Sequence, residues 1–220
     1  MLDSVLWARD RYLAPDGLMV PSHCTLHVAP ISDPDYITDH VSFWHSVYGF
    51  SMSSMLADTY KDVNIRHLSS SAVIGSSSIF LQLPLHSITP GELAFDRDWE
   101  FIIDKDADAL DGFAIWFDTF LLPHRDPVPA DVRAEEWKGS GVAFTTGPNG
   151  KETHWQQGLL LIDREKGVRN AIELKKGEGI KGRIRYRKQD HNSRELGIEM
   201  EWTVDRGGER REQGKQQWTL

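Results

Sequence analysis

An imidazole and an indole stand next to each other where a turn-rich segment enters an apolar run. Gly147-Pro148-Asn149-Gly150 is a tight-turn sequence, Thr153-His154-Trp155 follows it, and Gly158-Leu159-Leu160-Leu161-Ile162 reads as a buried strand. A histidine can orient a carboxylate or carry a proton near neutral pH, and the face of an indole attracts a cation. A strand edge that is merely packed or solvated can carry the same pair. The residues alone leave both interpretations open.

The loop needs a scaffold, and much of the chain alternates apolar and polar residues in the way that predicts β-strands. Residues 180–187 alternate apolar side chains with Lys and Arg, and residues 195–204 alternate them with Glu. If these two strands pair as a hairpin, Arg lies opposite Glu and favours that register. Residues 112–121 are apolar enough for a strand buried on both sides, and Gly207-Gly208 is the expected last turn. The pattern predicts a β-barrel or sandwich.

Two segments break the β pattern with helical spacing. Residues 2–13 place apolar side chains on one face of a helix, which Pro15-Asp16-Gly17 ends. Residues 35–56 read as helical pieces with more aromatic and Met surface than a short excursion needs for its own packing. Those side chains are Phe43, Trp44, Val47, Tyr48, Phe50, Met52 and Met55. The simplest interpretation is that they cover one end of the barrel.

Composition excludes several classes of function. The net charge of −8 argues against broad nucleic-acid binding, which needs a basic face, and suits a basic partner. Cys24 is the single cysteine, so we expect no disulfide framework and assign no metal site. No apolar run approaches the ~20 residues that span a bilayer, so no membrane partner is expected. No G-x-G-x-x-G follows a predicted strand, which argues against a nucleotide site in this chain.

Residues 92–111 form the most acidic stretch of the sequence. They contain eight acids and two bases, a local balance of 8 − 2 = 6 negative charges. Such a strand can be a solvated face that discourages edge pairing. It can also steer an Arg-rich peptide towards the molecule. The first interpretation is the simpler one unless this face lies near the pocket.

Four segments together resemble the protein arginine methyltransferases. Thr145-Thr146-Gly147-Pro148 leading to Thr153-His154-Trp155 is similar to the family's Thr-His-Trp loop. Residues 1–13 resemble the helix after its catalytic hairpin, and residues 13–21 are similar to the link out of its cofactor domain. Phe43-Trp44 with residues 47–53 resembles the start of its dimerisation arm. Residues 216–220 look closest to the type 3 branch. The order and spacing of these pieces make the resemblance specific.

The resemblance implies a mainly β fold, an antiparallel β-barrel with an N-terminal helix and an inserted helical dimerisation arm. Residues 1–16 would be the helix and linker from a cofactor domain, which we expect this chain to lack. Residues 17–220 would be the substrate-binding barrel, with the arm at about residues 35–76. The proline-rich stretch 123–140 looks longer than the corresponding family segment, and the sequence does not reveal its role.

The implied activity is the transfer of a methyl group from S-adenosyl-L-methionine to an arginine guanidino nitrogen. The cofactor and a pair of glutamates would lie on the missing domain, so we expect this fragment alone to be inactive. His154 would position the active site, and Trp155, Thr153 and Met1 would contact the substrate, although Met1 could equally be an initiator residue placed by cloning.

The full-length enzyme would be a cytoplasmic homodimer that acts on arginine/glycine-rich proteins, with ribosomal proteins implied by the type 3 branch. The alternative is a non-enzymatic β-barrel that binds a peptide or sugar through His154 and Trp155.

Overall fold

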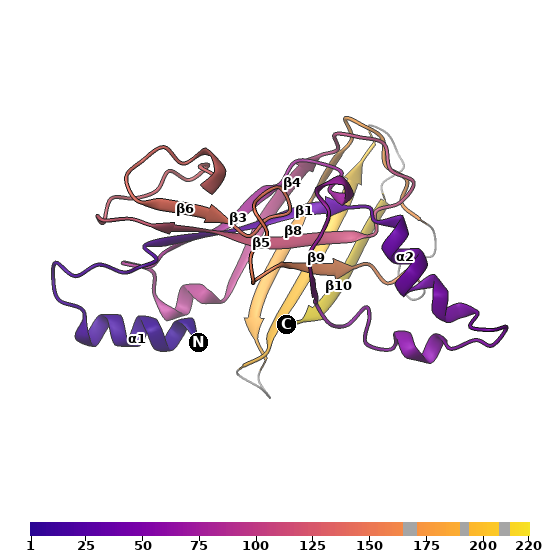
Figure 1. The fold of residues 1–220 in the computed structure, drawn as a ribbon, viewed down its shortest axis with the longest axis horizontal. Helices are drawn as coiled ribbons and strands as arrows, with labels where there is room; N and C mark the ends of the chain where they lie inside the picture. The colour runs from indigo at the N-terminus through magenta and orange to yellow at the C-terminus, as the bar shows by residue number, and fades with distance from the viewer. Residues whose placement is uncertain (165–170, 190–193, 207–211) are drawn as a thin grey trace.

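The computed structural model describes residues 1–164, 171–189, 194–206 and 212–220 (Figure 1). They form two antiparallel sheets, as the alternating pattern predicts. The first sheet has the order β2-β7-β5-β1-β3, with β6 paired to β5. Its strands are β1 (His23–Ile31), β2 (Asn64–Arg66), β3 (Ser78–Pro84), β5 (Gly112–Leu121), β6 (Val142–Thr145) and β7 (Gln157–Leu161).

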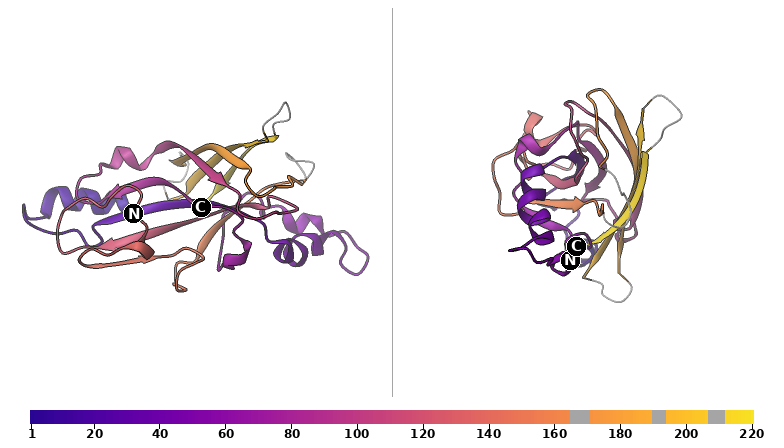
Figure 2. Two further views of the ribbon diagram at one scale, coloured as in Figure 1. Left: turned by 90° about the horizontal axis from the view of Figure 1, so that it is seen from above. Right: turned by 90° about the vertical axis from the view of Figure 1, so that its right-hand side faces the viewer.

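The second sheet has the order β10-β9-β8-β4 and lies along one side of the molecule, as the end-on view in Figure 2 shows. Its strands are β4 (Phe95–Ile102), β8 (Gly179–Lys188), β9 (Leu196–Asp205) and β10 (Glu212–Thr219). The predicted hairpin of residues 180–187 and 195–204 is confirmed, with Arg183 opposite Glu201 and Arg185 opposite Glu199. The Gly207-Gly208 turn lies outside the described residues.

The core lies between the two sheets and is largely aromatic. Trp99 stacks on Phe101 at 4.5 Å between ring centroids, and Phe113 meets Trp202 edge-on at 5.5 Å. Burial of large rings supplies much of the free energy that holds such sheets together. In the described part of the chain, isolated backbone bridges join the sheet edges, Asp62 with Thr219 and Gly75 with Ile103. The expected barrel is therefore present as two sheets that a continuous ladder does not close.

The acidic strand β4 is neutralised within its own sheet. Arg185 donates to Asp96 at 2.8 Å and to Glu201 at 2.9 Å, and it also pairs with Glu199. The hydrogen bond from Arg185 holds the pKa of Asp96 below its usual value. Arg183 lies 3.3 Å from Asp96 as well. These pairs favour the solvated-face interpretation of the stretch over an attractor for Arg-rich peptides.

Helices lie at the two ends of the sheets (Figures 1 and 2). Helix α1 (Leu2–Tyr12) occupies one end and packs Leu6 into the core. The other end carries α2 (Pro34–His40), whose N-terminus Asp33 caps by accepting from the Tyr36 amide. Short 3-10 helices complete the chain at Ser42–His45, Ser53–Leu56, Ser70–Ala72, Pro90–Leu93 and Ala134–Glu136. None of the described helices is both long and apolar enough to cross a bilayer.

Candidate functional site

The Thr-His-Trp loop connects β6 to β7 and is fastened at its base. The Thr146 hydroxyl donates to the Phe117 carbonyl at 3.0 Å and accepts from the Phe117 amide at 3.1 Å. The Gly147 amide donates to the Thr145 hydroxyl at 3.0 Å. Buried hydrogen bonds of this kind are costly to break, because the groups left behind lose both water and partner. The base of the loop is therefore held rigidly against β5.

Glycine is required where the loop turns. The Gly150 amide donates to the Gly147 carbonyl at 3.1 Å and closes a tight turn. A Cβ on Gly147 would lie 2.7 Å from the Trp116 ring nitrogen, and one on Gly150 would lie 2.3 Å from the Thr145 methyl group. Both distances are too short for a side chain, so the turn packs closely on β5 and β6.

Trp155 is fixed in place and still open to solvent. Its ring meets Phe117 edge-on at 5.9 Å and stacks on Phe144 at 6.0 Å, yet the residue is 56% exposed. His154 is exposed, and its ring lies edge-on to Trp155 at 6.3 Å between centroids. An ordered indole face beside an imidazole can receive a cationic side chain such as a guanidinium.

The structure places the other two predicted substrate-binding residues, Thr153 and Met1, in two different pockets. Thr153 is half-buried beside Trp155, and its hydroxyl has no hydrogen-bond partner among the described residues. It lines a hollow of ≈ 300 Å³ with Phe144 and Glu135. Met1 is fully exposed and lines a separate apolar pocket of ≈ 530 Å³ beside Phe95. Thr153, His154 and Trp155 therefore lie together, and Met1 lines a different pocket.

A buried polar cluster supports the strands under the loop. The Nε2 atom of His27 lies 3.3 Å from Asp118 and 2.9 Å from the Thr25 hydroxyl, and Arg133 donates to His27 Nδ1 at 3.3 Å. Because arginine has no acceptor, the imidazole proton belongs on Nε2, facing Asp118. Burial raises the pKa of Asp118, but hydrogen bonds from His27 and the Ala134 amide outweigh burial and lower it overall. Asp118 pairs in register with Thr145, the last residue before the loop.

The proline-rich stretch 123–140 is anchored to this cluster. Arg133 donates to the Ser77 hydroxyl at 2.5 Å and to the Ser77 carbonyl at 2.8 Å. The Ala134 amide donates to Asp118 at 2.8 Å, and Trp137 packs edge-on against Phe120 at 5.5 Å. These contacts place Glu135, which follows Ala134 in the chain, on the wall of the hollow that Thr153 lines. The stretch is thus a fixed wall beside the loop.

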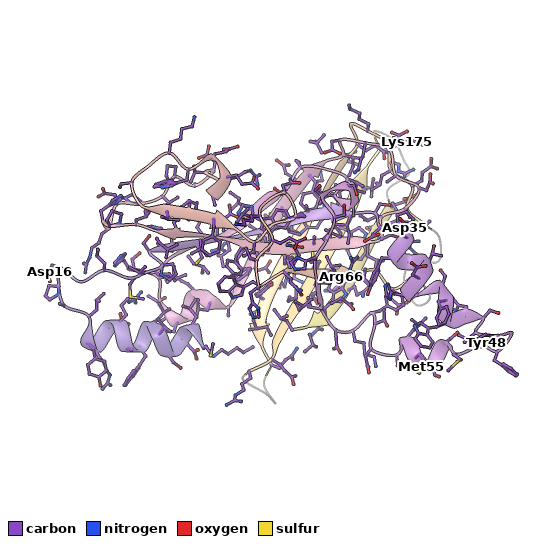
Figure 3. All side chains as sticks on the ribbon, in the orientation of Figure 1. Asp16, Asp35, Tyr48, Met55, Arg66 and Lys175 are labelled. Atoms are coloured by element: carbon purple, nitrogen blue, oxygen red, sulfur yellow. The ribbon has the colours of Figure 1, made fainter. Side chains whose placement is uncertain are left out.

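The predicted arm residues lie beyond the end of the sheets, where Figure 3 labels Tyr48 and Met55. Tyr48 is 97% exposed and Phe50 is 73% exposed, at the tip of a turn that Val47 and Phe50 close through two hydrogen bonds. Phe43, Met52 and Met55 are also exposed, whereas Trp44 and Val47 are half-buried. Among the described residues these rings mostly face solvent, so they are not used to pack the end of the barrel that α2 occupies.

Several supporting residues were missed because nothing in the sequence points to their partners. Asp118 interrupts an apolar strand and Gln157 stands at the start of one, which is the one visible signal that they have buried polar roles. Phe117 and Phe144 could be read only as strand residues. Their contacts with Trp155 depend on the pairing of β5 with β6.

The described residues do not fit S-adenosylmethionine. A hollow of ≈ 680 Å³ lies on the second sheet among charged side chains that include Asp98, Lys181 and Glu201. It has no glycine-rich turn leading to a helix N-terminus, the usual cradle for an adenosyl cofactor. In the same described part of the chain, no three His, Cys, Asp or Glu side chains are grouped to hold a metal.

Comparison with known proteins connects this geometry to a family. Residues 22–207 match the arginine methyltransferase oligomerization subdomain. The chain is similar to the ribosomal protein arginine N-methyltransferase rmt3 of Schizosaccharomyces pombe, with 34% identity over 206 residues. That alignment covers 93% of this chain and 36% of the relative, so the chain spans about a third of that protein's length.

Two solved structures share the fold. One is the Trypanosoma brucei PRMT1 enzyme-prozyme heterotetrameric complex with AdoHcy, at a TM-score of 0.80 and 22% identity, covering 100% of this chain and 63% of that one. The other is Arabidopsis thaliana protein arginine methyltransferase 10, at a TM-score of 0.72 and 23% identity, covering 100% of this chain and 65% of that one.

Proposed function

The chain belongs to the protein arginine methyltransferase family, and on that premise we propose that it is the barrel-side half of a methyl-transfer site. In this proposal it is the C-terminal substrate-binding and dimerisation part of a full-length enzyme of the type 3 kind. The observation that carries the proposal is the Trp155 ring, locked between Phe117 and Phe144 with more than half of its surface open beside His154.

The chemistry explains why a second half is needed. A guanidinium is a poor nucleophile, because its lone pair is delocalised and its charge is permanent. Carboxylates can hold it, localise its charge and aim one nitrogen at a methyl donor. S-adenosylmethionine would supply the methyl group from a domain outside this chain, together with a pair of glutamates. The residues of this chain would bind and orient the acceptor.

Each loop residue has a role that follows from its surroundings. The exposed face of Trp155 would form one wall of the arginine pocket, since an indole attracts a guanidinium. His154, exposed at the end of the locked loop, would pair with an acidic group of the cofactor domain and fix its orientation. Thr153 would contact the substrate at the hollow that it lines with Glu135. These are positioning and binding roles rather than proton abstraction.

The proposed partners and location follow from the same assignment. The arm would bind a second copy of the full-length protein and form a homodimer, which the exposed rings of Tyr48 and Phe50 support. Substrates would be arginine/glycine-rich proteins. A ribosomal protein is the specific candidate, because the relative rmt3 is named for ribosomal proteins. The resemblance to the type 3 branch supports a cytoplasmic location for the full-length enzyme.

The test is His154→Ala in the full-length protein, assayed for methyl transfer to an Arg-Gly-rich peptide. We expect kcat to fall by about tenfold or more, since misplaced catalytic geometry is costly. The melting temperature should stay close to that of wild type, because His154 is exposed. Glu100→Ala, at an exposed side chain on β4 in the other sheet, is the control and should leave kcat unchanged. Equal kinetics in both variants would make His154 an ordinary loop residue.

A further inference from the structure

A single buried amide joins the Thr-His-Trp loop to the strand by which the arm returns to the barrel. Gln157 is the first residue of β7 and is 5% exposed. Its partner in the neighbouring strand β2 is Arg66, which follows the exposed arm residues 43–55 in the chain. The residue therefore stands between the two features that the proposed function depends on.

Both ends of the Gln157 side chain are used. Its Nε2 atom donates to the Thr146 carbonyl at 2.6 Å, and its Oε1 atom accepts from the Leu68 amide at 2.8 Å. Thr146 begins the loop, and Leu68 follows β2. An apolar side chain at this position would leave a buried carbonyl and a buried amide without partners, which costs more than the bonds themselves contribute.

The same strand β2 is tied to the first helix of the arm. Arg66 Nη2 lies 2.6 Å from Asp33 Oδ2, and its guanidinium stands over the Tyr36 ring at 3.9 Å. The other carboxylate oxygen of Asp33 accepts from the Tyr36 amide at 3.2 Å and caps α2. A continuous set of contacts thus leads from α2 through Arg66 and β2 to Gln157 and the loop.

We infer that Gln157 is a positioning residue that couples the loop carrying His154 and Trp155 to the way the arm holds strand β2. Contacts that the arm makes in an assembled enzyme would then steady the loop. The inference rests on the proposed function for its catalytic consequence. The two hydrogen bonds of Gln157 are a property of the fold, and their effect on the loop can be measured without methyl transfer.

The variants separate the two ends of the amide. Gln157→Ala removes both hydrogen bonds. Gln157→Glu keeps an oxygen for the Leu68 amide and removes the N–H that Thr146 receives. Gln216→Ala is the matched control, because that side chain also joins separate segments. It donates to the Tyr60 and Leu161 carbonyls at 2.9 Å and accepts from the Asp163 amide at 2.8 Å, and these three partners lie outside residues 146–156.

Amide hydrogen exchange over residues 146–156 of the full-length protein is the first measurement. Gln157→Ala and Gln157→Glu should each raise exchange in this loop about tenfold, the effect of losing one or two buried hydrogen bonds. Only Gln157→Ala should also expose the Leu68 amide. The Gln216→Ala control should leave the loop unchanged. Loop exchange within twofold of wild type in both Gln157 variants, or the same increase in the control, would overturn the inference.

Coupling to the arm needs a double-mutant cycle, because contiguous contacts alone do not demonstrate it. Arg66→Ala should raise loop exchange by itself, and adding it to Gln157→Ala should produce no further increase. Fully additive effects would contradict the coupling.

Methyl transfer supplies the catalytic readout. kcat should fall about tenfold in Gln157→Ala and stay within twofold of wild type in Gln216→Ala. A full-length wild-type protein with no methyl transfer would refute the proposed function. Amide hydrogen exchange would still show whether Gln157 holds the loop. If the wild-type enzyme transfers methyl groups and Gln157→Ala has the same kcat, the positioning role of Gln157 is refuted and the proposed function stands.

Discussion

The residues that matter most for the site differ in how they depend on the fold. His154 and Trp155 can be recognised from the sequence because an imidazole and an indole follow a glycine-proline turn. The residues that support them, Gln157 and Asp118, cannot be recognised in this way, because their partners come close only when β2, β5 and β6 assemble. Of the predicted loop and substrate-binding residues, Met1 is the one that the structure sets apart, in an apolar pocket beside Phe95.

Asp118 makes a pH-dependent contribution to stability. Its pKa lies below the ordinary 3.8 in the folded chain, so the unfolded chain binds the proton more readily as the pH falls. The stabilisation is complete well above pH 3.8 and is lost as the pH falls below that value. Asp118→Asn should cost about 1–3 kcal/mol at neutral pH and flatten the acid limb of the stability profile. Chemical denaturation between pH 7 and pH 2 measures both effects.

The control for that measurement is Asp131→Asn, at an exposed carboxylate in the same proline-rich stretch. It should leave the neutral-pH stability and the acid limb as they are in wild type. An Asp118 variant with an unchanged acid limb would show that the buried pair with His27 does not contribute to the pH dependence.

At the scale of elements, the alternation of β8 and β9 was enough to predict their hairpin and its Arg–Glu register, which the structure confirms. The helical pieces of residues 35–56 and the strand at residues 112–121 were also predictable, because their periodicity is local. The open sheet edges were not, since closure depends on contacts between residues far apart in the chain. The anchoring of the proline-rich stretch by Arg133 is non-local for the same reason.

Gly182 tests how tightly the second sheet is packed. It lies in register between Trp99 and Trp202, and a Cβ there would fall 1.8 Å from the Glu201 carbonyl oxygen and 2.7 Å from the Trp99 ring. Gly182→Ala should therefore destabilise the chain by about 2–3 kcal/mol through overpacking. Thermal unfolding would measure this against Gly91→Ala, where a Cβ meets nothing within 4 Å. Equal melting temperatures for the two variants would contradict this packing.

At the scale of the whole molecule, the sheets separate two functional ends. Helix α1 lies at one end, and the arm with its exposed Tyr48 and Phe50 lies at the other (Figure 1). An exposed aromatic surface of this kind indicates a protein partner. In the proposed dimer that partner surface belongs to the cofactor domain of a second copy, which these 220 residues do not provide.

The isolated chain should therefore not form a dimer held by its arm. Light scattering on wild type and on a Tyr48→Ser/Phe50→Ser variant should give the same mass, since the arm has no surface to bind. If the isolated wild-type chain is a dimer and the double variant is a monomer, the prediction is contradicted. In the full-length protein the same two substitutions should weaken the dimer.

The most direct measurement of the proposed half-site compares methyl transfer by the full-length protein with transfer by residues 1–220 alone. Both would receive labelled S-adenosylmethionine and an Arg-Gly-rich peptide at equal concentration. We expect the full-length protein to label arginine, Trp155→Ala to reduce that labelling about tenfold or more, and the isolated chain to give only background. Turnover by the isolated chain, or full activity without the Trp155 ring, would contradict the division of the site between two domains.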